Sequence, residues 1–175
     1  MYKLSDVPSD QIRQYCFDLN KELLPPLTVM VQDLQCFKNH TVSLEVPNRA
    51  IVDKASDWSL EWNYYFNDEW RKEPCRFGVA FMDGANLCGL LLGRFDPRQS
   101  ALRVFMLEGN PSSAHAFKGF ILEIADMALQ AASVQAGVSS IRIEQPTLET
   151  INLYERVGYS FIGGHPGYCL KVLSR

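Results

Sequence analysis

Asn152–Phe161 has the sequence NLYERVGYSF, and this stretch decides the fold. Pro146-Thr147, just before it, can begin a short helix, since proline fits the first turn of a helix. Gly158 takes the left-handed conformation cheaply, so we expect it to end the helix, with Tyr159 packing back on it. The stretch therefore predicts a short amphipathic helix that leads directly into a strand over Ser160–Ile162.

The residues on either side of this stretch predict further regular elements. Gly137 is expected to end a long helix, because glycine is common just past a helix end. Ser139–Glu144 then predicts a strand, and Tyr168–Leu173 predicts the last strand. The apolar stripe of the long helix consists of Phe117, Ile121, Ile124, Ala128 and Ala131.

Three strand-like runs precede the long helix and predict an antiparallel meander over Phe77–Met82, Leu87–Phe95 and Ala101–Glu108. Asp83-Gly84 is a strong hairpin signal between the first two runs, because both turn positions tolerate positive φ. Residues 88–92 lack polar alternation, which indicates a central strand covered on both faces.

The N-terminal part of the sequence predicts five more elements. Proline cannot donate the hydrogen bond of a helix, so Pro25-Pro26 is expected to end the first helix. The helix predicted at Ser56–Lys72 has one broad aromatic face, which indicates core packing or, in part, the lining of a substrate pocket. The five elements are a strand at Tyr2–Val7, a helix from Pro8 to Leu24, a short helix at Leu27–Phe37, a strand at Thr41–Val46 and a helix at Ser56–Lys72.

The order of these elements predicts one α/β (α+β) domain over residues 1–175, with a mixed, mostly antiparallel central sheet flanked by helices. A hydrophobic content of 47% excludes a disordered chain. A net charge of −3 with scattered basic residues argues against nucleic-acid binding, and no apolar run approaches the length of a membrane span. Five cysteines without CxxC spacing predict reduced thiols in a cytoplasmic protein and no metal site.

The element order and Asn152–Phe161 together resemble the GCN5-related N-acetyltransferase (GNAT) family. In that family a Leu-Tyr-Glu-Arg/Lys-x-Gly-Phe/Tyr motif leads into the sixth strand. Gly137–Ile143 likewise resembles the helix-ending glycine and fifth strand of the family, and the likeness extends from Phe77 to the end. The resemblance implies transfer of an acyl group, usually acetyl, from acetyl-coenzyme A (acetyl-CoA) by direct attack of a neutral amine.

The resemblance implies three catalytic candidates. Tyr154 matches the family tyrosine that usually protonates the leaving thiolate or hydrogen-bonds the thioester sulfur. Glu108 ends the predicted fourth strand, where some members place a general base, and Glu144 ends the fifth. Either carboxylate could deprotonate an amine if its pKa were raised. The alternatives are solvated carboxylates at strand ends and a buried tyrosine whose hydroxyl reaches the surface.

The resemblance also implies how acetyl-CoA would bind. Backbone N–H groups beside a splayed fourth strand polarise the thioester carbonyl. Those at the N-terminus of the long helix bind the pyrophosphate, because that helix end carries partial positive charge. The residues expected to bind acetyl-CoA are Met106, Leu107, Asn110, Ser112, Ser113, Lys118, Gly119, Thr147 and Asn152.

The phosphate loop departs from the family pattern Gln/Arg-x-x-Gly-x-Gly/Ala. Counting back from Gly137 places this loop at Phe117–Leu122, which has one glycine among bulky side chains. In one explanation the helix begins early, Gly109–Ser113 is a phosphate-facing turn with a serine cap, and Lys118 contributes charge. In the other, the phosphate site is lost and Phe117–Leu122 is packed helix.

Several functions therefore stay open at the level of the sequence. The first is an acetyl-CoA-dependent N-acyltransferase whose acceptor is a small amine or a protein amino group; the acidic composition favours a basic acceptor. The second is a catalytically inactive binding or regulatory protein of the same fold, and the third is an unrelated α+β domain. A homodimer is an open alternative to a monomer. His40, His115 and His165 are isolated in the sequence, and isolated histidines are more often structural or exposed than catalytic.

Overall fold

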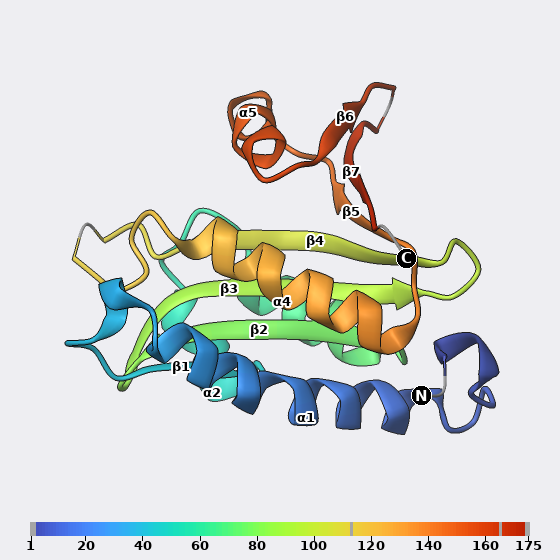
Figure 1. Ribbon diagram of the computed structural model, residues 1–175, viewed down its shortest axis with the longest axis horizontal. Helices are drawn as coiled ribbons and strands as arrows, with labels where there is room; N and C mark the ends of the chain where they lie inside the picture. Colours follow the sequence, from blue (N-terminus) through green and yellow to red (C-terminus); the bar gives the residue numbers. More distant parts are fainter. Residues whose placement is uncertain (1–2, 113, 165, 174–175) are drawn as a thin grey trace.

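A mixed sheet runs through the centre of the molecule in the computed structural model (Figure 1). Over residues 3–112, 114–164 and 166–173, which the structure describes, the chain forms seven strands: β1 Val42–Glu45, β2 Arg76–Asp83, β3 Asn86–Asp96, β4 Ala101–Gly109, β5 Ser140–Glu144, β6 Ser160–Ile162 and β7 Tyr168–Val172. The helices are α1 Ile12–Gln32, α2 Arg49–Val52, α3 Trp62–Tyr64, α4 Ile121–Ala136 and α5 Leu148–Arg156. The strand order is β1-β2-β3-β4-β5-β7-β6, with β4 and β5 parallel and the other neighbours antiparallel. This arrangement confirms the predicted mixed, mostly antiparallel α/β sheet.

Helices cover both faces of the sheet on the side of β1–β4. Figure 1 shows α1 and α4 side by side in front of the strands, with α2 behind them. Because side chains alternate along a strand, Phe81 joins the core under α1 and α4, while Ala80 joins the core formed with Trp62 of α3. Residues 88–92 are buried throughout, between both cores, which confirms the predicted central strand.

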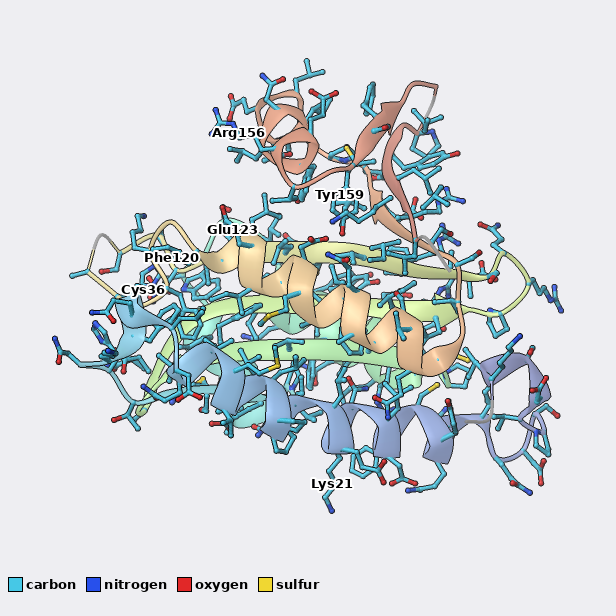
Figure 2. The ribbon with its side chains drawn as sticks, viewed as in Figure 1. Lys21, Cys36, Phe120, Glu123, Arg156 and Tyr159 are labelled. Atoms are coloured by element: carbon cyan, nitrogen blue, oxygen red, sulfur yellow. The ribbon has the colours of Figure 1, made fainter. Side chains whose placement is uncertain are left out.

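The first helix is longer than predicted, because α1 passes through Pro25 and Pro26 instead of ending there. Proline leaves the carbonyl four residues earlier without its helical partner, and those carbonyls belong to Lys21 and Glu22. Both prolines and both of these residues are exposed, and Figure 2 shows Lys21 pointing away from the sheet. Water can bind the freed carbonyls, so the helix continues and its inner face stays buried through Leu19, Leu23, Leu27 and Val31.

The strand predicted at Tyr2–Val7 is wrong, since Leu4–Asp6 forms a 3-10 turn; Tyr2 itself lies outside the described residues. Leu4 anchors this turn in the core, whereas Asp6 is exposed. The separate helix predicted at Leu27–Phe37 is also wrong: its first half belongs to α1, and Gln35–Phe37 forms a 3-10 turn.

The helix predicted at Ser56–Lys72 begins only at Trp62 and contains a π-helical turn at Tyr65–Glu69. The residues before it stay outside the helix because the N–H groups of residues 59–60 donate to the carboxylate of Glu108 on β4. The aromatic face mainly packs into the core, as one of the two predicted alternatives requires. Its most buried side chains are Trp62, Phe66 and Trp70.

Candidate active site

The cleft of the molecule begins where β4 leaves β5. The two strands pair only between Ala101–Val104 and Ser140–Ile143. Phe105 is an extra residue opposite β3, and a bulge of this kind bends its strand. Gly93 lies opposite the bulge, where an added Cβ would sit 2.4 Å from the carbonyl oxygen of Arg103. Past the bulge β4 no longer pairs with β5, so the two strand ends border an open cleft.

A cavity of about 310 Å³, here called the first cavity, occupies this cleft between the ends of β4 and β5 and the inner side of α5. The fold brings the three predicted catalytic residues, Tyr154, Glu108 and Glu144, to its walls. Leu107 and Thr147, predicted to bind acetyl-CoA, line it as well. The other lining residues are Ser59, Leu60, Val104, Phe105, Ile143, Gln145, Pro146 and Thr150.

Tyr154 lies on the wall of the first cavity that α5 forms. Tyr154 is 8% exposed, and its ring packs edge-on against Tyr159 with 6.0 Å between ring centroids. Burial raises the pKa of Tyr154 to about 12, so the phenol is protonated at neutral pH. Among the described residues, no protein group hydrogen-bonds its hydroxyl. The hydroxyl can therefore donate a hydrogen bond or a proton to a group bound in the cavity.

Glu108 has a different environment, because four donors converge on its carboxylate. The main-chain N–H groups of Ser59 and Leu60 lie 2.9 and 3.2 Å from its oxygens. The hydroxyl of Ser59 and the indole N–H of Trp62 donate to it as well, the latter at 2.7 Å. Glu108 therefore ties the loop before α3 to the end of β4, and its oxygens are already in use as acceptors.

Glu144 is held by two arginines. The Nε atom of Arg103 lies 2.7 Å from its carboxylate, and the Nε atom of Arg142 lies 3.4 Å from the same oxygen. The side chain of Glu144 is only 9% exposed. Its hydrogen bond raises the pKa of Arg103, which also lies 3.6 Å from Asp96. Glu144 is thus part of a compensated ion-pair cluster at the edge of the first cavity.

A second cavity, of about 470 Å³, lies at the N-terminus of α4 and reaches α5. Helix α4 begins at Ile121, and Phe120 before it provides no side-chain cap. The N–H groups of the first turn have no intrahelical partner and carry partial positive charge, which suits an anion. Figure 2 shows Glu123 at the start of α4 and Arg156 on α5, across the opening between these helices. The lining residues are Gly109, Asn110, Pro111, His115, Lys118, Gly119, Ile121, Leu122, Glu123, Leu153 and Arg156.

This start of α4 contradicts the helix bounds that both explanations drawn from the sequence assume. The helix begins at Ile121 and not within Gly109–Ser113. The residues just before it form a turn instead of packed helix, because Gly119 takes a φ of +82°, which costs glycine little. The buried ring of Phe117 packs against Phe37, with 4.9 Å between centroids, and holds the turn against the core. The segment that counting back from the helix end aligns with the phosphate loop of the family therefore forms this turn.

Solved structures of N-acetyltransferases share this architecture. The aminoglycoside 6'-N-acetyltransferase from Enterococcus faecium is 18% identical, with a TM-score of 0.58 over 77% of this chain and 97% of that chain. The ribosomal-protein-S18-alanine N-acetyltransferase from Escherichia coli is 12% identical, with a TM-score of 0.55 over 75% and 92%. An aminoglycoside 6'-N-acetyltransferase complexed with coenzyme A is 14% identical, with a TM-score of 0.57 over 77% and 97%. The chain has the fold of the GCN5-related N-acetyltransferases.

The GNAT fold is what these similarities establish, since a fold alone does not determine an activity. No family model matches the sequence, and no curated protein matches it. The function must therefore be argued from the residues that this chain places around the two cavities of the fold.

Within the GNAT fold, the remaining residues predicted to bind acetyl-CoA lie in different places. Met106 is buried in the aromatic core. Asn110 lines the second cavity, and its side-chain amide donates to a main-chain oxygen of β3 at 2.8 Å. Ser112 lines a third cavity of about 530 Å³ beside the β2–β3 turn. Asn152 is exposed on α5 and lines neither of the first two cavities, and Ser113 lies outside the described residues.

The histidines have no common site. His115 lines the second and third cavities, and burial lowers its pKa, which favours the neutral imidazole. His40 lies 2.9 Å from Asp83, and His165 is outside the described residues. No cluster of three or more His, Cys, Asp or Glu side chains suited to a metal occurs in the part of the chain that the structure describes. Within those same residues, no helix has the length and apolar character needed to cross a membrane.

Sequence reasoning found Lys118 but missed the arginines around the two cavities. Leu153 and Arg156 both line the second cavity, and residues three apart share one side of a helix. That spacing could have placed Arg156 beside the second cavity. Arg103 and Arg142 have no such local signal, because their contact with Glu144 depends on the register between β4 and β5.

Proposed function

We propose that this protein is an N-acetyltransferase that moves an acetyl group from acetyl-CoA to an amine. The observation that carries the proposal is the protonated hydroxyl of Tyr154, which has no protein partner among the described residues and lines the cleft between β4 and β5. Helix α5 forms a wall of both cavities, through Thr150 and Tyr154 in the first and Leu153 and Arg156 in the second. An elongated substrate can therefore lie along α5.

The residues of the second cavity fit the phosphate end of acetyl-CoA. The uncapped start of α4 offers backbone N–H groups, and Lys118 and Arg156 add positive charge around it. In the first cavity, the free edge of β4 at Leu107 would offer a backbone N–H group to a thioester carbonyl. Acetyl-CoA, when bound, supplies the activated acetyl thioester.

The protein must then donate one proton to the leaving sulfur. The amine nitrogen forms a bond to the acetyl carbon, the carbon–sulfur bond breaks, and Tyr154 gives its phenolic proton to the sulfur. The amine proton passes to water, and solvent returns a proton to the phenol. Glu108 takes no part in this scheme, because both of its oxygens accept hydrogen bonds from other groups of the protein. Glu144 is left out because one of its oxygens is ion-paired with Arg103 and Arg142.

The geometry also bears on the alternative of an inactive protein of the same fold. Such a protein would have its cleft filled by Phe117, Phe120 or the aromatic segment before β2. Phe117 instead packs in the core, and Phe120 lines neither cavity. Trp62 turns its indole N–H to Glu108 without lining the first cavity. Open space in the cleft therefore supports the enzyme.

Titration of acetyl-CoA by calorimetry, with a thermal-shift scan, tests the proposal. We expect a Kd in the micromolar range and a melting temperature that rises with ligand concentration, because a ligand of the native state stabilises it. Desulfo-coenzyme A, which keeps the phosphates and lacks the thioester, is the matched ligand control and should also bind. No binding of either compound at millimolar concentration would overturn the proposed function.

A further inference from the structure

Two cysteines that the proposed acetyl transfer does not use lie together where α1 packs on the start of β2. Cys16 is on the buried side of α1, and Cys75 directly precedes β2. The thiol of Cys16 hydrogen-bonds the sulfur of Cys75, and both side chains belong to the same hydrophobic core. Both are free thiols in this structure. The contact between this helix and this strand therefore contains a pair of adjacent thiols.

Polar contacts hold the two backbone segments together on either side of the thiol pair. The buried amide of Asn20 donates to the carbonyl oxygen of Cys16 at 3.0 Å and to that of Arg76 at 3.1 Å. One turn earlier on α1, the guanidinium of Arg13 donates to the main-chain oxygen of Lys72 at 3.1 Å. A disulfide forms without strain only where the two Cα atoms lie within roughly 7 Å. Because these contacts keep the backbones close, the two sulfurs can join with little movement of the core.

The surroundings of the pair make one sulfur more reactive than the other. Cys75 is 7% exposed and Cys16 is fully buried, so a small oxidant reaches Cys75 first. The hydrogen bond from Cys16 lowers the pKa of the Cys75 thiol. The charge of Arg94 acts in the same direction, while burial and the carboxylates of Glu73 and Asp96 oppose it. Since the thiolate is the reactive form, Cys75 is the expected nucleophile and Cys16 is the partner that closes the disulfide.

We propose that Cys16 and Cys75 are a modification site, at which hydrogen peroxide forms a reversible disulfide that links α1 to β2. The Cys75 sulfur bonds to one peroxide oxygen, the O–O bond breaks, and water leaves with the thiol proton, so that Cys75 becomes a sulfenic acid. The Cys16 sulfur then attacks the Cys75 sulfur, the S–O bond breaks, and the hydroxyl leaves as water with the Cys16 proton. The two thiols are oxidised to one disulfide, and the peroxide is reduced to two waters. A thiol reductant reverses the reaction, and this proposal is independent of the acetyltransferase function.

Oxidation of the full chain in dilute solution tests the proposal. Hydrogen peroxide is added until the exposed Cys36 is oxidised, and the remaining thiols are then blocked. Trypsin places the two cysteines on peptides 14–21 and 73–76, so mass spectrometry reads their linkage directly. We expect these two peptides to be joined, with the loss of two hydrogen atoms, and dithiothreitol to separate them. The oxidised chain should melt about 5 °C higher, because the link restricts the unfolded chain.

Three variants separate the roles of the two sulfurs. In Cys16→Ala the oxidised Cys75 has no partner, so dimedone should trap it as a sulfenic acid. In Cys75→Ala the buried Cys16 should stay a thiol under the same treatment. Cys88→Ala removes another buried cysteine and is the matched control, which should form the linked peptides as fast as the unaltered chain.

Thiols at Cys16 and Cys75 that survive while Cys36 of the same sample is oxidised would overturn the proposal. A linked product that joins other cysteines in place of this pair would overturn it as well. An oxidised chain that melts below the reduced one would show that the disulfide does not fit the native contact, with the same consequence. If the alanine variants do not fold, the joined peptides of the unaltered chain still decide.

Discussion

At the scale of single residues, the first cavity holds two groups of opposite character. The hydroxyl of Tyr154 has no protein partner among the described residues, while the carboxylate of Glu108 has four donors. A hydroxyl that gives a proton to the substrate must have its O–H free of protein acceptors. A carboxylate that accepts hydrogen bonds on both oxygens instead stabilises the local structure. The two residues should therefore respond differently to substitution.

Tyr154→Phe removes the phenolic proton but keeps the ring that packs on Tyr159. We expect kcat to fall by about two orders of magnitude with an unchanged melting temperature, since general-acid assistance is of that size. Thiol release under saturating acetyl-CoA measures it, and Tyr64→Phe, at a residue 60% exposed, is the control. Unchanged turnover in Tyr154→Phe would remove this hydroxyl from the mechanism.

Glu108→Gln replaces one acceptor oxygen with an NH2 group, whose hydrogens then face either the two donors of Ser59 or the donors of Leu60 and Trp62. We expect the free energy of unfolding to fall by about 2 kcal/mol, because hydrogen bonds to a charged group are lost. Turnover should fall less than tenfold. Urea unfolding and steady-state kinetics measure the two quantities, with Glu61→Gln, in the same loop and exposed, as the control. A loss of turnover above a hundredfold in a stable variant would instead make Glu108 a base.

At the scale of elements, α4 is joined to the C-terminal strands by a polar cluster. Asp126 of α4 is buried, accepts a hydrogen bond of 2.9 Å from the hydroxyl of Tyr159 and lies 2.6 Å from the ammonium of Lys171 on β7. Figure 2 shows Tyr159 between the C-terminal hairpin and α4. This cluster connects the helix that starts at the second cavity to the segment that follows α5.

Asp126→Asn leaves the ammonium of Lys171 without its counter-charge in a place where it is only 13% exposed. We expect the variant to lose about 3 kcal/mol of unfolding free energy, because one partner of a buried pair stays behind unpaired. Adding Lys171→Met should recover part of the loss. Urea unfolding of the two single variants and the double variant measures the coupling, and strictly additive losses would show that the pair does not interact.

Elements with local signals were predictable from the sequence. The left-handed Gly137 and the helix before Gly158 lie where their chemistry requires. A hairpin joins β2 to β3 as predicted, but its turn residues are Gly84 and Ala85, because Asp83 still pairs with Asn86 at the end of β2.

Among the N-terminal predictions, the strand at Thr41–Val46 is confirmed by β1, whereas the predicted helix bounds failed because contacts outside the local sequence decided them. Pro25-Pro26 is tolerated on the solvent side of α1, and the loop before Trp62 is held by Glu108 from a strand far along the chain.

At the scale of the whole molecule, the fold and the gathering of Tyr154, Glu108 and Glu144 could be predicted, but their environments could not. The donors around Glu108 and the arginines around Glu144 come from segments that only the complete sheet brings together. The start of α4 was missed for a similar reason, since the buried ring of Phe117 fixes the preceding turn from outside the helix. A cytoplasmic location and a homodimer stay predictions.

The short parallel ladder between β4 and β5 has the position of a hinge between the two sides of the cleft. Only Ala101–Val104 and Ser140–Ile143 join the two halves of the sheet along these strands. Gly109 lies five residues past the last pair, about 17 Å away at the rise of a strand. A rotation of about 5° around the ladder would therefore widen the far end by about 1.5 Å, and it would shift the side chains of β5 and β7 within the core that they share with β4 and α4. The polar cluster of Asp126, Tyr159 and Lys171 joins α4 to the C-terminal strands and would oppose that rotation.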